Sequence, residues 1–165
     1  MLYRYFTILL ASALVVAGLQ VTGFIDQYEQ RLSAHFFEVA NNLQGFQQIA
    51  DQYHGGSLAA LIEKHRQSPE ATFSSEAIVI ADMYNRLIQF EAAMAGLNTS
   101  LAGRIIEVSI NADREIFDET ISNYTYTITL NTDSAFCAGG LLVFGILLSD
   151  TLRLIIGRIF RHRRA

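Results

Sequence analysis

Three of the four histidines and the single cysteine are the side chains that could carry chemistry in this 165-residue chain. The Asp51-x-x-His54 spacing puts a carboxylate and an imidazole on one helix face, and His35 and His65 are further candidates. Such groups bind metal ions or form acid–base pairs. The histidines are scattered and form no dense motif such as H-E-x-x-H. We therefore expect surface or capping histidines, and we expect no catalytic residue, no metal ligand and no cofactor.

Cys137 is the only cysteine, which excludes a disulfide framework. It lies in an apolar stretch that gives a thiolate no positive surroundings, so we expect it to pack as a small apolar residue. We find no nucleophile elbow, phosphate-binding loop or dinucleotide fingerprint, and no basic face suited to nucleic acid. The sequence predicts a non-enzymatic protein that does not bind nucleic acid.

Two long stretches contain no charged residue. Residues 6–25 form an uncharged run of 20 residues, which as a helix spans about 30 Å, the thickness of the hydrocarbon core of a bilayer. Residues 134–149 form a second uncharged run that can continue as a helix to Ile156. The sequence therefore predicts transmembrane helices at 6–25 and 134–156.

The charges are divided unequally around these runs. Residues 26–133 hold 6 Lys and Arg against 15 Asp and Glu, whereas the flanking segments hold 6 Arg and one Asp. Basic residues next to spans stay in the cytoplasm. This predicts cytoplasmic termini at 1–5 and 157–165, with membrane lipids around the spans and an extracytoplasmic domain at 26–133. The alternative is a signal peptide cleaved after Val15-Val16-Ala17.

Apolar residues in the outer segment recur at steps of three and four, which predicts helices. A long first helix continues to Tyr53, Gly55-Gly56 ends it, and Ser57 caps a short second helix that stops at Ser68-Pro69. A third helix opens at Ser74 or Ser75, and Thr99 or Ser100 starts a fourth that continues to Ile116. The seams of the longer helices are residues 25, 28, 32, 36, 39, 43, 46, 50 and 53; 80, 83, 87, 90, 94 and 97; and 101, 105, 108, 112 and 116. We expect an all-α antiparallel bundle, with Leu43 and Leu87 in its core.

The stretch from Tyr124 to Leu130 alternates like a strand. We interpret it as a short extended connector before the second span, with tyrosines in the interfacial belt. Pairing with a second protomer or a partner, or continued helix, are the alternatives. Thr132 is the expected cap of the second span.

Small residues in both spans allow close packing of helices. In the first span they are Ser12, Ala13, Ala17 and Gly18, and in the second they are Gly139, Gly140 and Gly145. We expect the two spans to pack together through them, although contacts with another protein's spans are the alternative.

Asp150 is an ionisable residue at the end of the second span, where such groups are often functional. A headgroup position, with Arg153 in ion-pair reach, is the simpler interpretation. Beyond it, apolar residues at helical spacing alternate with arginines, the pattern of an interfacial helix. We predict lipid contacts there, or an ordinary positive flank, at Arg158, Arg161, Arg163 and Arg164.

Several short motifs resemble a known family. They are Gly23-Phe24-Ile25-Asp26-Gln27-Tyr28, Arg31, Ala34-His35, Leu43-x-Gly45-Phe46, Gly55-Gly56-x-Leu58-x-x-Leu61, His65-Arg66-x-Ser68 and Phe73. Over residues 1–75 the chain resembles small proteobacterial inner-membrane proteins that are known only as a domain of unknown function. The resemblance implies a bacterial inner membrane and two spans around an extracytoplasmic helical domain, but no activity.

These observations favour a membrane subunit whose outer domain binds or positions an envelope partner, or a second copy of the chain. The alternative is a ligand-sensing input module that signals through a partner protein, since a span, an outer bundle and a second span also form such modules.

Overall fold

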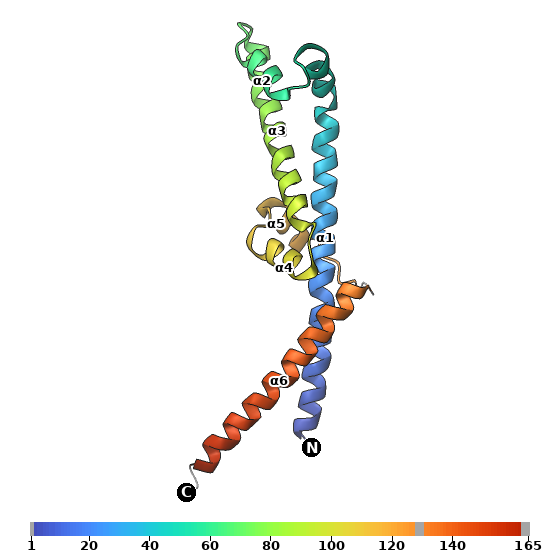
Figure 1. The fold of residues 1–165 in the computed structure, drawn as a ribbon, viewed down its shortest axis with the longest axis vertical. Helices are drawn as coiled ribbons and strands as arrows, with labels where there is room; N and C mark the ends of the chain where they lie inside the picture. Colours follow the sequence, from blue (N-terminus) through green and yellow to red (C-terminus); the bar gives the residue numbers. More distant parts are fainter. Residues whose placement is uncertain (1, 128–130, 163–165) are drawn as a thin grey trace. The chain divides into compact units, whose positions relative to one another are not determined.

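The computed structural model describes residues 2–127 and 131–162, with side chains for 5–127, 131–151 and 153. Its helices are α1 (Leu2–Tyr53), α2 (Leu58–Arg66), α3 (Ala71–Leu97), α4 (Leu101–Ile110), α5 (Arg114–Ser122) and α6 (Thr132–His162) (Figure 1). The described residues contain no strand, so the predicted all-α class is confirmed.

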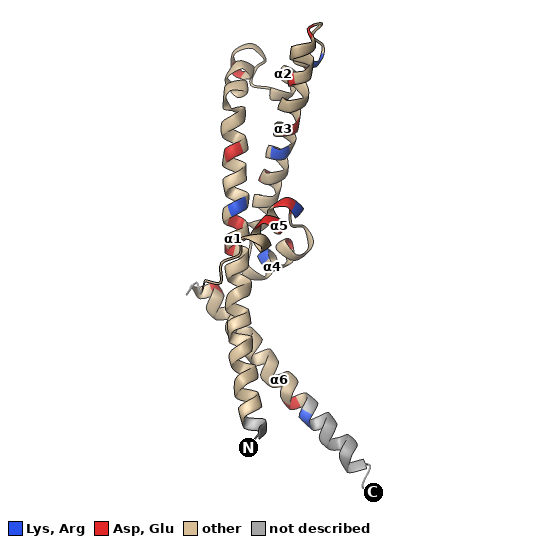
Figure 2. Ribbon diagram, turned by 180° about the vertical axis from the view of Figure 1, so that it is seen from behind, with Lys and Arg blue, Asp and Glu red and all other residues tan. Residues whose placement is uncertain are grey.

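The chain divides into two compact units that share α1. The first unit comprises residues 1–27 and 123–165, and the second comprises residues 28–122. The helical stretches Tyr5–Tyr53 and Thr132–Thr151 each contain a window long and apolar enough to cross a membrane. Figure 2 shows a long tan stretch along the lower part of α1 and another along α6 before its red and blue turns. The helices that could span a membrane are therefore the two that the sequence predicted.

In the first unit, α1 and α6 pack through small residues. Gly18 is buried, and a Cβ added to it would lie 2.6 Å from Ala138 Cα. Gly145 is also buried and leaves room for Leu14. Thr22 Oγ1 and Ser134 Oγ share a buried hydrogen bond of 2.8 Å. The two helices thus approach closely and join their polar groups to each other, as apolar surroundings require.

The predicted packing face was partly wrong. Gly18 and Gly145 do lie between the helices, but Ser12, Ala13 and Ala17 are exposed. A Cβ on Gly139 or Gly140 would meet nothing within 4 Å. The way the two helices cross, and not the presence of small residues, decides which side of α1 meets α6. The contact therefore uses a side of α1 next to Ser12, Ala13 and Ala17.

Residues 124–127 form neither helix nor strand, in agreement with the predicted connector, while residues 128–130 of the predicted stretch lie outside the described residues. The Gln27 side chain donates to Thr125 O at 2.8 Å and accepts from Thr125 N at 3.1 Å. Tyr124 Oη donates to Gln20 Oε1 at 2.6 Å, and its ring lies 5.7 Å from that of Phe24. Side-chain amides of α1 therefore take the place of a partner strand.

In the second unit, residues 28–53 of α1 run antiparallel to α3, with α2 between them in the chain (Figure 1). Gly55 and Gly56 have φ of 60° and 83°, and Ser57 caps α2 by accepting from Ala60 N, both as predicted. The buried seam residues include Leu32, Val39, Leu43, Ala50, Ile80, Phe90, Leu97, Val108 and Ile116. Leu43 is in the core as predicted, whereas Leu87 is half-buried and Tyr53 is exposed.

Three predicted helix boundaries were wrong. The third helix starts at Ala71 because the chain turns directly after Pro69, and Ser74 is already inside it. The predicted fourth helix is two helices, because Asp113 Oδ1 accepts from Ile116 N and starts α5. The cap of α6 is Asn131, whose Oδ1 accepts from Ser134 N, rather than Thr132.

The contact at Gly18 generates a stability prediction. Gly18→Leu forces a side chain into Ala138 and should destabilise the folded chain by about 1–3 kcal/mol, the usual cost of overpacking. Gly139→Leu is the matched control, because the space around Gly139 is open. Thermal unfolding in detergent micelles should show a lower Tm for Gly18→Leu alone. Equal Tm values for both variants would contradict the packing of α1 on α6.

Candidate functional site

One cluster of titratable side chains connects α1 to α5 in the second unit. It consists of Arg31, His35 and Glu119, which we call the Glu119 cluster. Arg31 Nη1 donates to Glu119 Oε1 at 3.2 Å, and His35 Nε2 lies 2.8 Å from Oε2. Arg31 and His35 are one turn apart on α1, so both reach the same carboxylate. Both side chains are about three-quarters buried, and the carboxylate is 38% exposed.

Phe90 of α3 lies next to this cluster. Its buried ring is 6.2 Å from the His35 ring, and the Arg86 guanidinium lies 5.4 Å from its centroid. Arg86 also pairs with Glu115 of α5 at 3.2 Å. These contacts hold α5 against both α1 and α3. The arrangement is that of a structural brace, in which imidazole and guanidinium groups face acidic residues on one short helix.

The surroundings shift two pKa values in this unit. The hydrogen bond from His35, followed by the charges of His35 and Arg31, lowers the pKa of the Glu119 carboxyl. Burial raises the pKa of the Tyr28 phenol, whose Oη accepts a hydrogen bond from Asp113 N at 2.9 Å. Glu119 is therefore held as a carboxylate and Tyr28 as a neutral phenol.

Asp51 and His54, which the sequence places on one helix face, form no hydrogen bond or ion pair with each other among the described residues. Asp51 Oδ1 accepts from Gln47 Nε2 at 2.7 Å, and Gln47 also reaches Gly56 O. These contacts tie the end of α1 to the turn that follows. Among the described residues, no group of three or more His, Cys, Asp or Glu could hold a metal ion.

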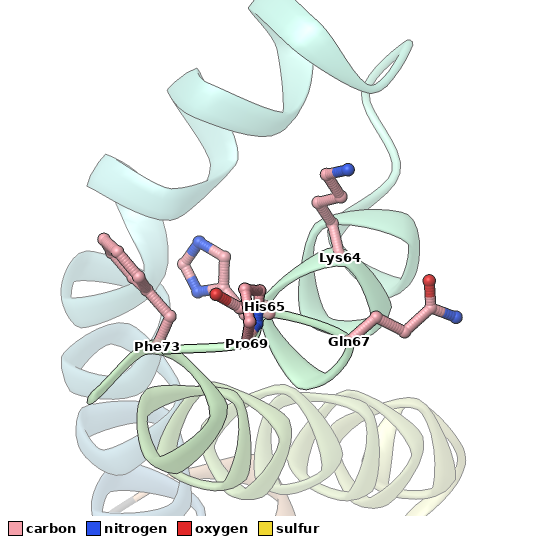
Figure 3. Close-up of a pocket in the computed structure, with 6 residues that line it drawn as sticks. Lys64, His65, Gln67, Pro69 and Phe73 are labelled. Carbon is pink, nitrogen blue, oxygen red and sulfur yellow. The ribbon is translucent and has the colours of Figure 1, made fainter. Parts of the chain in front are cut away.

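A pocket of about 290 Å³ lies at the turn between α2 and α3 (Figure 3). We call it the α2–α3 pocket; it is lined by Lys64, His65, Gln67, Ser68, Pro69 and Phe73. The His65 and Phe73 rings are adjacent, with centroids 5.6 Å apart, while Lys64 and Gln67 point away from them. The enclosed His65 Nδ1 has no hydrogen-bond partner within the described residues. The pocket thus presents an aromatic wall of His65 and Phe73, with the enclosed His65 Nδ1 behind it and a lysine at its rim.

The remaining candidates lie in the first unit. Asp150 is on an exposed side of α6, and Cys137 is a partly exposed free thiol in the same helix. The predicted lipid-contact residues Arg158, Arg161, Arg163 and Arg164 lie outside the residues whose side chains the structure describes.

Comparison with known families adds one match. The model of the family described as "Protein of unknown function (DUF2937)" matches residues 2–162, nearly the whole chain. The chain belongs to the DUF2937 family. This confirms membership of a family of unknown function and extends it well beyond residues 1–75. No curated protein and no solved structure matches the chain.

Sequence reasoning missed the Glu119 cluster of this DUF2937 protein because its members lie more than 80 positions apart. One signal was present: Arg31 and His35 flank Leu32 of the buried seam, one turn apart. Cationic groups at the edge of an apolar seam need an acidic partner on the element packed beside them. The sequence leaves open which of the four acidic residues of 113–119 supplies it.

The lowered pKa of Glu119 predicts a pH-dependent contribution to stability. A carboxyl with a depressed pKa stabilises the fold above its unfolded value, about 4.3, and loses that contribution as pH falls through the folded value. Glu119→Gln should lower Tm at neutral pH, and the gap to the wild type should narrow below about pH 4. Solvent exposure makes the effect small.

Asp118→Asn is the matched control on the same helix, because its carboxylate is 69% exposed and 4.0 Å from Arg114. Thermal unfolding of both variants should be followed across this pH range. A Glu119→Gln variant with an unchanged Tm at neutral pH would show that the cluster does not brace α5.

Proposed function

We propose that this protein is a multi-pass protein of the bacterial inner membrane. Residues 6–25 and 134–156 cross the bilayer, residues 26–133 lie outside the cytoplasm, and both termini lie inside. Two observations support this: the two apolar helical windows, and the excess of arginine in the flanks over an acidic middle segment. The close contact at Gly18 and the shared Thr22–Ser134 hydrogen bond also suit paired helices in lipid.

This topology predicts the activity of reporter fusions. Alkaline phosphatase is active only outside the bacterial cytoplasm, so a fusion after Ala165 should be inactive and an insertion near Asn98 should be active. Green fluorescent protein at the same two positions is the reciprocal control, with the fluorescent fusion expected after Ala165. The reverse pattern for both reporters would overturn the proposed orientation.

We further propose that the outer domain is a non-enzymatic module that binds or positions an envelope partner. The observation that carries this is the number of large apolar side chains left exposed on α1 and α3 of the second unit. They are Phe37, Ile49, Tyr53, Phe73, Ile78, Val79 and Ile88. The inward seams of these helices are filled by other residues, such as Leu43 and Phe90. Large exposed apolar patches are typical of protein interaction sites.

The α2–α3 pocket supports a second candidate function, a ligand-sensing module that signals through a partner. Its His65 and Phe73 rings and the Lys64 ammonium suit a small aromatic or anionic ligand. Lys64 and Gln67 point away from the His65 and Phe73 rings (Figure 3). We rank this function second because one open pocket covers less of the domain than the exposed apolar residues do.

Photo-crosslinking in living cells tests the partner-binding function. Benzoylphenylalanine at Ile78 or Val79, which are 63% and 58% exposed, should give a discrete adduct on illumination. The matched control is the same group at Gln89, an exposed polar position on α3. An adduct at twice the 18.4 kDa chain mass indicates a second copy, and any other mass a different protein. Equal labelling at all three positions, or none, would contradict a docking surface and favour the ligand-sensing candidate.

A further inference from the structure

The α4 helix turns both of its charged residues toward the protein. Arg104 Nη2 donates to Glu29 Oε2 of α1 at 2.6 Å, and the Arg104 side chain is only 16% exposed. The Glu107 carboxylate lies against Gly96 of α3, where an added Cβ would be 2.6 Å from Oε1. No charged residue of α4 is therefore left on its outer side.

The outer side of α4 is apolar instead. Ile106 is 57% exposed and Ile110 is 75% exposed, and the exposed Ala102 precedes them at the same spacing. Residues four apart lie on one side of a helix. We call Ala102, Ile106 and Ile110 the α4 face. A helix that faces water carries its charges outward and its isoleucines inward, so the α4 face has the opposite polarity.

Two contacts connect the chain around the α4 face to the end of the uncharged run of α1. Glu29, the partner of Arg104, follows Ile25 by four residues of one continuous helix, about 6 Å of rise. At the other side, α5 ends at Ser122, two residues before Tyr124, which bonds to Gln20 of the uncharged run. Both contacts connect to the part of α1 at which the bilayer ends in the proposed topology.

We propose that the α4 face lies on the bilayer, with Ile106 and Ile110 in the boundary between headgroups and acyl chains. Amphipathic helices bind membranes in this way, through apolar side chains that enter the boundary while polar groups stay outside it. Lipid is favoured over a protein partner because of the short distance from Glu29 to Ile25. The inference rests on the proposed membrane insertion of residues 6–25 and is independent of partner docking at α3.

Site-directed spin labelling of the full chain tests this inference. A Cys137→Ser variant removes the native thiol, and Ile106→Cys and Ile110→Cys each then receive a nitroxide. The proteins are placed in nanodiscs of phosphatidylethanolamine and phosphatidylglycerol. Collisions with oxygen, which concentrates in lipid, are compared with collisions with a water-soluble nickel chelate. The controls are Ile78→Cys, at 63% exposure on α3, and Leu9→Cys, at 72% exposure within the uncharged run.

Labels at Ile106 and Ile110 should collide more with oxygen and less with nickel than the label at Ile78 does. Leu9 should show the strongest lipid signature. If the label at Leu9 is in lipid but the labels at 106 and 110 collide with oxygen and nickel as the label at Ile78 does, the inference about the α4 face is overturned. The proposed membrane insertion is then retained. Labels at 106 and 110 protected from both reagents would show a protein partner and also overturn it. A water-exposed Leu9 would overturn membrane insertion, and the inference with it.

Discussion

A single unbroken helix, α1, joins an uncharged stretch to an amphipathic one, and this constraint organises the protein. The 52 residues of α1 begin with a run that has no charge from Tyr5 to Ile25 and continue as an amphipathic helix to Tyr53. A backbone in lipid must satisfy its own hydrogen bonds, which a helix does throughout. No proline or cap interrupts α1 between these two stretches. The apolar helix α6 packs against the uncharged run of α1, and the remaining helices pack against its amphipathic part.

The elements beside the uncharged run bring few polar groups, and those groups are paired. Thr22 bonds to Ser134 in a buried contact, and Gln20 receives the Tyr124 hydroxyl. The Gln27 side chain forms hydrogen bonds with both the N–H and the carbonyl oxygen of Thr125. An unpaired polar group costs more in apolar surroundings than in water, so these pairs limit how α6 and the connector can sit on α1. Beyond Tyr28 the contacts change to ion pairs, as at Arg31 and Glu119.

Local features of the sequence were sufficient to predict most helices and turns. The seam from Ile25 to Ala50 repeats at helical spacing, and Gly55-Gly56 with Ser57 specifies a turn by backbone conformation and capping alone. The break between α4 and α5 escaped prediction because apolar spacing continues through it. It depends on Asp113, which caps α5 while its N–H donates to the Tyr28 hydroxyl 85 positions away. The Glu119 cluster and the face of α1 that meets α6 escaped for the same reason, because tertiary packing decides them.

The burial of the side chains distinguishes those that hold residues 28–122 together from those that remain exposed to other molecules. Its short helices α4 and α5 bury Val108 and Ile116, and ion pairs orient them: Arg104 to Glu29, Arg31 to Glu119, and Arg86 to Glu115. Ion pairs of this exposure contribute little individually, but they set orientation because each arginine must meet one carboxylate. Exposed apolar residues such as Ile110 and Ile78 lie outside the internal seams. Side chains of this kind on a domain attached to apolar helices are the basis of the two proposals made above, lipid contact for α4 and protein contact for α3.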